Sequence, residues 1–163
     1  MDKKAISNPF QSTAAPFSSK VNEVELHYCR PRINTLPGVS KSSDVAAIFR
    51  SIYPPGKMDL KEYFYVAYLT RSNHVLGVAR LSEGSLTGTV VDIREVFVLA
   101  LKLNAIGMVL CHNHPSGTMR PSPSDISLTN KVKQVAQLMD MALLDHIILN
   151  SEGYYSFTDE GDL

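Results

Sequence analysis

The pattern of apolar and polar residues predicts an alternation of strands and helices along most of the chain. Val21–Cys29 alternates apolar and polar side chains, which is typical of a half-buried strand. Glu62–Leu69 is aromatic and branched and predicts a central strand, and Val75–Leu81 follows a short turn, so the pair predicts a hairpin. Further strands are predicted at Val90–Val91, Ile106–Cys111, Leu143–Leu149 and Tyr154–Phe157.

Helical spacing of apolar residues appears in three segments between these strands. The first follows Asp44 and ends before Pro54, and the second covers Ile93–Asn104 with Asp92 as its cap. The third runs from Ser124 to about Met141. Hairpins mixed with helical crossovers predict an α/β or α+β sheet layered against helices.

The two ends of the chain lack such a pattern. Residues 1–20 are rich in Ser, Ala, Pro and Lys without a clear period, which predicts a flexible tail. Residues 21–163 have the length of one domain. The last residues, Thr158–Leu163, are mostly acidic and are expected to fray.

Composition narrows the classes of function. With 16 basic and 16 acidic residues the net charge is zero, so charge gives no support for direct nucleic-acid binding. Two cysteines among 163 residues imply no disulfide framework and favour the cytoplasm. The sequence has no apolar stretch of membrane-spanning length and no apolar region typical of a signal peptide.

The residues from Cys111 to Asp125 carry the candidate chemistry. His112 and His114 stand two apart at the end of a predicted strand, so both imidazoles can face the same side. A polar loop then leads to a predicted helix whose start includes Asp125. Two imidazoles and one carboxylate suit a divalent metal such as zinc, with a fourth position left for water.

Plainer interpretations accompany this one. Ser122 to Asp125 is also an ordinary helix start, with a capping serine, a proline and an acidic residue in the first turn. Cys111 could be a soft ligand, but on a strand it should face away from both histidines, as a small core residue. Ser116 is expected to hold the loop rather than to act as a nucleophile.

A longer motif resembles a known family. The segment from His112 to Gly117, followed by Pro121, Ser122 and Asp125, looks like the metal motif of the JAMM (MPN-type) superfamily. More closely, it resembles the RadC family, bacterial proteins long labelled as DNA repair proteins. The resemblance spans roughly residues 22–160 and includes these further segments: Gly88–Val90, Arg94–Val96, Asp145–Ile148 and Gly153–Phe157.

This resemblance implies a three-layer cytidine-deaminase-like α/β sandwich, a mixed sheet with helices packed on it, that holds one Zn²⁺. By position, His112, His114 and Asp125 would be the zinc ligands, and Ser122 would hydrogen-bond an oxyanion. The bond cut would be an amide or isopeptide of a protein or peptide substrate.

The sequence departs from the family pattern in two places. The family uses a glutamate as general base, and we place it by spacing on the strand Leu76–Leu81, at Ala79 or Arg80. Glu83 is the nearest carboxylate in that segment, whereas Glu95 matches a different family position. In addition, residues 1–40 are too short and polar to form the helix-hairpin-helix region of longer RadC relatives.

Three functions follow from these observations. The first is a zinc metallopeptidase or isopeptidase, with Glu83 as its candidate base. The second is a non-hydrolytic zinc-holding binding module, which a missing glutamate would favour, with DNA repair or replication factors as candidate partners. The third is a metal-dependent nuclease, which the neutral charge disfavours. A further feature is Asp145-His146, which could orient a ligand or could be a satisfied pair at a sheet edge.

Overall fold

The fold is an α/β arrangement in which one sheet lies between helices. The computed structural model describes residues 28–29, 31–84 and 91–163. Their elements follow in this order: a 3₁₀ turn at Ile33–Thr35, α1 (Ser42–Ile52), β1 (Tyr63–Leu69), β2 (Val75–Glu83), α2 (Ile93–Lys102), β3 (Gly107–Asn113), α3 (Pro123–Leu138), β4 (Ala142–Leu149), β5 (Tyr154–Ser156) and α4 (Phe157–Glu160). In the described part of the chain, no helix is long and apolar enough to cross a membrane.

The five strands form one mixed sheet in the order β2-β1-β3-β4-β5. The predicted hairpin is confirmed, because β1 and β2 pair antiparallel. On its other side β1 pairs antiparallel with β3, and β3 pairs parallel with β4. The parallel pair requires a crossover, which α3 supplies. β3 therefore lies at the middle of the sheet, with its histidine end beside the start of α3.

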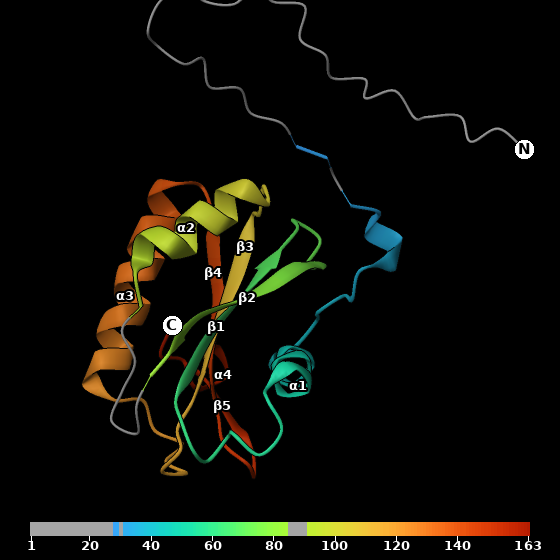
Figure 1. Ribbon diagram of the computed structural model, residues 1–163. Coiled ribbons are helices and arrows are strands. Elements are labelled where there is room, and N and C mark those ends of the chain that lie inside the picture. The colour runs from blue at the N-terminus through green and yellow to red at the C-terminus, as the bar shows by residue number, and fades with distance from the viewer. Residues whose placement is uncertain (1–27, 30, 85–90) are drawn as a thin grey trace, which may run out of the picture.

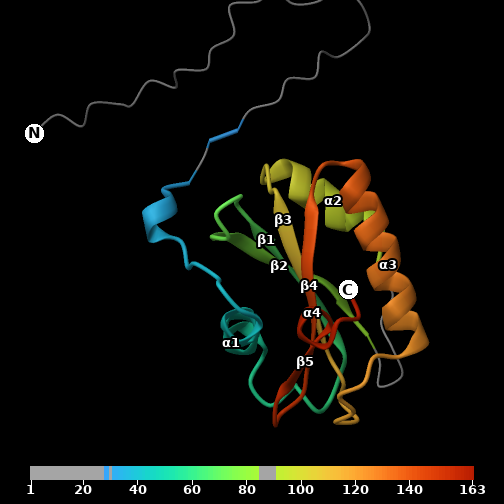
Figure 2. The same cartoon turned by 180° about the vertical axis from the view of Figure 1, so that it is seen from behind.

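Helices cover both faces of the sheet, which gives three layers (Figure 1). α1 lies on one face, and α2 and α3 lie on the other, as the reverse view also shows (Figure 2). Alternate residues of β1 and β3 point to opposite faces, as strand geometry requires. On the α1 face Phe49 packs with Tyr65 and Cys111, and on the α2/α3 face Val96 and Val132 pack with Phe64 and Leu110. The expectation of a sheet layered against helices is confirmed.

Several boundaries differ from the sequence expectations. β3 continues past Cys111 through Asn113, because His112 and Asn113 are buried and pair with β4. The expected fraying of Thr158–Leu163 is wrong at its start: α4 forms there, held by a fully buried Phe157. Val91 is not in a strand, and most of the strand predicted at residues 21–29 lies outside the described residues.

Candidate metal centre

The first two site residues are placed by β3. His112 pairs across the sheet with Phe64 of β1, and Phe64 belongs to the core on the α2/α3 face. Because residues on directly opposed positions share a face, His112 points to the same side. His114 lies just past the end of β3, where its backbone N–H donates to the Leu149 carbonyl at 3.0 Å. That bond continues the pairing with β4, so both imidazoles reach the same region.

The third site residue, Asp125, lies in the first turn of α3. Ser122 caps this helix, with Pro123 at its first position. The Ser122 backbone N–H donates to Asp125 Oδ2 at 2.7 Å, and the Ser122 hydroxyl donates to the same oxygen at 2.6 Å. Asp125 N donates in return to Ser122 Oγ at 3.2 Å, and together these cap bonds hold the carboxylate in place without a metal. Asp125 Oδ1 is then the oxygen that faces His112 Nε2, at 3.3 Å.

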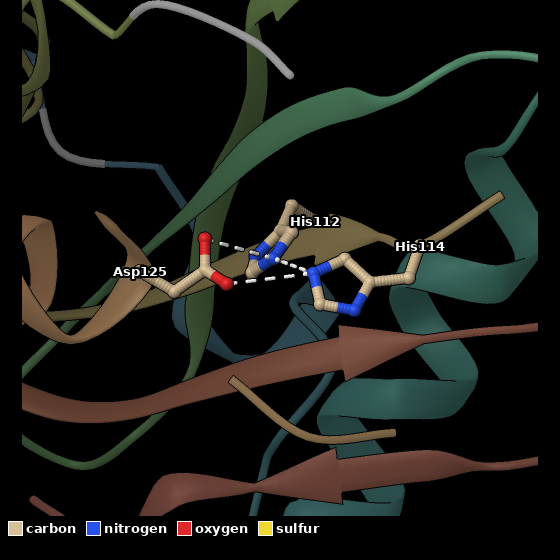
Figure 3. A group of neighbouring side chains, drawn as sticks. All are labelled: His112, His114 and Asp125. Carbon is tan, nitrogen blue, oxygen red and sulfur yellow. Dashed lines mark hydrogen bonds and ion pairs between the residues drawn. The ribbon is translucent and has the colours of Figure 1, made fainter. Parts of the chain in front are cut away.

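The three side chains converge on one point (Figure 3). His112 Nε2 lies 2.9 Å from His114 Nε2, and His114 Nε2 lies 3.4 Å from Asp125 Oδ2. One ligand atom from each of the three residues lies within 4.8 Å of the others. His112 is 1% exposed, whereas the His114 and Asp125 side chains are each 14% exposed. The cluster is therefore buried on the protein side and open on the other.

The donor chemistry of this cluster fits a divalent metal. His114 Nδ1 lies 2.8 Å from the Thr118 carbonyl, which can only accept, so Nδ1 carries the proton and Nε2 keeps its lone pair. That lone pair faces a carboxylate and a second imidazole nitrogen, an arrangement that a cation would satisfy. Three such ligands with an open side could hold a divalent metal ion and leave a further position for water. Cys111, in contrast, is buried in the core on the α1 face, as predicted.

Charge reinforces this arrangement. Burial opposes ionisation of Asp125, but the neighbouring His112 and His114 imidazoles outweigh it and hold the pKa of the carboxyl well below its usual value. The nearby Asp125 carboxylate in turn raises the pKa of His114 above its usual value. The site is thus a negative carboxylate among imidazoles, which attracts positive charge.

The structure adds a glutamate that sequence reasoning missed. Glu62 directly precedes β1, and its carbonyl accepts a bond from Gly84 N at 2.8 Å, so the strand pairing extends to it. Glu62 is two residues before Phe64, and period-two alternation places its side chain on the face of His112. Burial raises the pKa of the Glu62 carboxyl, while His112 and His114 act to lower it and Asp125 acts to raise it. The sequence signal that could have pointed to Glu62 is a charged residue directly before an otherwise apolar strand.

Glu83, the predicted candidate base, is not brought into the cluster. It pairs with Tyr63, which belongs to the core on the α1 face, opposite to His112. Its carboxylate binds Lys61 Nζ at 2.9 Å and lies 3.5 Å from Arg80 Nη1. The bond from Lys61 lowers the pKa of this exposed carboxyl. These partners hold Glu83 as part of a surface ion-pair network.

Asn113, between the two histidines, holds the backbone on either side of Glu62. Its Oδ1 accepts from Tyr63 N at 2.7 Å, and its Nδ2 donates to the carbonyls of Met58 at 2.5 Å and Lys61 at 2.7 Å. Asn113 is fully buried. The side chain therefore fixes the entry of the chain into β1, and with it the position of Glu62.

The roles proposed for Asp145 and His146 separate in the structure. Asp145 accepts bonds from Ser156 Oγ at 2.6 Å and Thr158 N at 3.0 Å, so it ties β4 to the last strand and helix. His146 is fully buried, and its Nε2 lies 2.8 Å from His112 Nδ1. Burial, together with the nearby His112, holds the pKa of His146 well below its usual value. His146 therefore contacts a ligand directly, whereas Asp145 is structural.

The loop between the two halves of the site is held by hydroxyl groups. Ser116 Oγ donates to Thr118 Oγ1 at 3.2 Å and accepts from Thr118 N at 3.4 Å. Because the Thr118 carbonyl accepts from His114 Nδ1, Ser116 supports the histidine through this turn, as expected from the sequence. The Ser122 hydroxyl is engaged by Asp125, and its expected bond to an oxyanion stays a prediction.

Comparisons with known proteins agree with this geometry. A family model described as "RadC-like JAB domain" matches residues 39–162. A UPF0758 protein of Flavobacterium johnsoniae is 43% identical over 126 residues, which cover 77% of this chain and 54% of that protein. A UPF0758 protein of Chlorobium chlorochromatii is 34% identical over 83% of this chain and 59% of that protein. A UPF0758 protein of Streptococcus gordonii is 38% identical over 63% of this chain and 46% of that protein.

The chain thus spans about half the length of the curated relatives it matches. The match of the family model nevertheless covers most of the chain, including all three candidate ligands and Glu62. Together with the His112-His114-Asp125 group, this match shows that the chain belongs to the RadC family and carries its JAB-type domain.

Proposed function

We propose that this domain is a zinc-dependent hydrolase that cleaves amide or isopeptide bonds of a protein or peptide. One observation carries the proposal: Glu62 shares a face and an electrostatic environment with the three candidate ligands. A metal group alone could be a binding site, but a carboxylate beside it completes a hydrolytic site.

Each residue has a distinct task in this proposal. His112, His114 and Asp125 would hold Zn²⁺, which when bound acidifies water and polarises the carbonyl to be attacked. Glu62 would take a proton from that water and later give it to the leaving amine. Its burial-raised pKa suits both steps, because a carboxyl that is too acidic returns protons poorly. Ser122 would turn its hydroxyl proton from Asp125 Oδ2 to the oxyanion that forms on the substrate, while its backbone N–H keeps the Asp125 carboxylate in place.

The test compares Glu62→Gln with the wild-type chain after zinc reconstitution. Fluorogenic peptides of mixed sequence and lysine-branched isopeptides serve as substrates, with cleavage sites read by mass spectrometry. We expect Glu62→Gln to keep its zinc and to lose about 100- to 10,000-fold in rate, because proton transfer fails. Glu83→Gln is the matched control, and its rate should stay near that of the wild type because its ion pairs lie on the other face.

The other outcomes separate the competing functions. Bound zinc with no cleavage of any substrate would contradict hydrolysis and support the metal-holding binding module. Equal loss of rate in both glutamate variants would remove the special role of Glu62. Plasmid DNA in the same assay tests the nuclease, since zinc-dependent nicking that His112→Ala abolishes would support it.

A further inference from the structure

A chain of hydrogen bonds connects the back of one candidate ligand to the backbone of another. His112 Nδ1 lies 2.8 Å from His146 Nε2, and His146 Nδ1 lies 2.7 Å from Thr129 Oγ1. The Thr129 hydroxyl then donates to the backbone carbonyl of Asp125 at 2.6 Å. His146 is 0% exposed and Thr129 is 2% exposed. The chain is therefore shielded from water along its length.

The direction of every bond in this chain follows from its last member. A carbonyl oxygen can only accept, so the single hydroxyl proton of Thr129 is committed to Asp125. Thr129 Oγ1 must then accept, and His146 Nδ1 must donate. A buried ring with one proton leaves Nε2 as an acceptor, so His112 Nδ1 is the donor. His112 Nε2 consequently keeps its lone pair on the side of His114 and Asp125.

We propose that Thr129 and His146 are positioning residues that fix the metal-binding tautomer of His112. This inference rests on the metal-binding part of the proposed function and not on hydrolysis. Both candidate histidine ligands would then carry their proton on Nδ1 and present Nε2 to the metal, because the Thr118 carbonyl holds the proton of His114 on Nδ1. Partners of this kind raise the affinity of a site by holding the ring and its proton in place.

Packing holds the His146 ring in the plane that the chain requires. Phe157 of α4 stacks on it with ring centroids 4.8 Å apart and planes inclined by 13°. Phe64 meets it edge-on, with centroids 5.8 Å apart. A partial rotation of the imidazole would break this stacking, and a half-turn would keep the plane but lose both hydrogen bonds, so the ring has one favourable orientation.

The test reads tautomers directly, by nitrogen-15 NMR of histidine-labelled, metal-free protein at alkaline pH. In the wild type we expect the proton on Nδ1 of both His112 and His146. Thr129→Val keeps the shape of the buried side chain and removes the hydroxyl, so both rings should become mixtures of tautomers. Thr129→Ser is the matched control, because it retains the hydroxyl and should retain the wild-type pattern.

Zinc titration of the same proteins gives an independent readout. We expect Thr129→Val to weaken zinc binding by about 10- to 100-fold and Thr129→Ser to leave it nearly unchanged. His146→Phe, which keeps an aromatic ring against Phe157, should weaken zinc binding by a similar factor. Far-UV circular dichroism of each variant shows whether the fold is retained.

Two results would overturn the inference. One is an unchanged His112 tautomer in Thr129→Val, and the other is wild-type zinc affinity in both Thr129→Val and His146→Phe. A wild-type protein that binds no zinc would instead contradict the proposed function, and the tautomers of the metal-free protein would still decide the role of Thr129. Zinc binding without peptide cleavage would leave the inference supported.

Discussion

At the residue scale, neighbouring positions at the end of β3 have different roles: the two histidines form the candidate metal site, and Asn113 between them holds the backbone. His112 and His114 point to the face of α3, whereas the Asn113 carboxamide reaches the backbone around Glu62. This backbone enters β1 from an irregular segment, and its carbonyls need partners because they are removed from water. Asn113 supplies donors to two of them and an acceptor to the following N–H.

Replacing Asn113 should therefore cost stability. Asn113→Ala leaves two carbonyls and one N–H without their partner, and each such group costs about 1–3 kcal/mol when buried. We expect the free energy of unfolding to fall by roughly 2–4 kcal/mol, measured by urea denaturation. Asn130→Ala, at an exposed position of α3, should change it by less than about 0.5 kcal/mol. A comparable small change for Asn113→Ala would show that water replaces these bonds.

Single residues of the site differ in how far the sequence could predict them. His112, His114 and Asp125 could be predicted because a strand end and a helix start are local patterns, only about a dozen residues apart. Glu62 lies fifty residues upstream of His112, and its approach depends on the register of Phe64 opposite His112. Nothing in the sequence states that register, so spacing pointed to Leu76–Leu81, whereas the carboxylate that the structure brings to the face of His112 is that of Glu62.

At the scale of elements, the first turn of α3 both caps the helix and positions the Asp125 carboxylate, a candidate metal ligand. The Ser122 hydroxyl donates to Asp125 Oδ2 and accepts from Asp125 N at 3.2 Å. The same bonds that satisfy the free N–H groups of the helix therefore orient the carboxylate. Helix stability and metal affinity should consequently change together when this cap is altered.

Ser122→Ala tests this coupling. We expect a loss of about 1 kcal/mol in the free energy of unfolding, which is typical of a lost cap. The Kd for zinc should rise by about tenfold or more, because Asp125 loses one of its two bonds from Ser122. Ser127→Ala, at an exposed position of the same helix, should change neither quantity appreciably. A weaker helix with unchanged zinc affinity would mean that the serine acts only as a cap.

The elements themselves were predictable where their pattern was long. β1 is an unbroken apolar run of seven residues, and the three longer helices space their apolar residues at helical intervals over ten or more residues. α4 has four residues, Phe157–Glu160, and three of these are polar, so the pattern could not distinguish it from a frayed end. Its buried Phe157 is ordered by stacking on His146, which is a tertiary contact.

At the scale of the whole molecule, we expect the fold to form without a metal. Two apolar cores, one on each face of the sheet, contain aromatic and branched side chains from every long element. The candidate ligand group lies where β3 ends and α3 begins, and its residues belong to neither apolar core. A domain of this kind buries enough apolar surface to fold alone, in contrast to small zinc-dependent domains.

Metal removal should therefore lower stability without unfolding the chain. After treatment with a chelator we expect an unchanged far-UV circular dichroism spectrum and a lower Tm. Free zinc at 100 times its Kd should restore about 2.7 kcal/mol, since it binds only the folded state. His114→Ala should show no zinc-dependent change in Tm. Loss of the dichroism signal on chelation would show that the metal is part of the folding core.

The bond pattern around Asp125 also bears on which ion occupies the protein in a cell. Its carboxylate is held by α3 and the two imidazoles by bonds behind them, so an arriving ion meets a rigid set of ligands. Such a ligand set discriminates weakly among divalent ions of similar size, so the ion that binds depends on intrinsic affinity and on the concentration of each available metal. We therefore expect the metal found in purified protein to follow the trace-metal content of the growth medium.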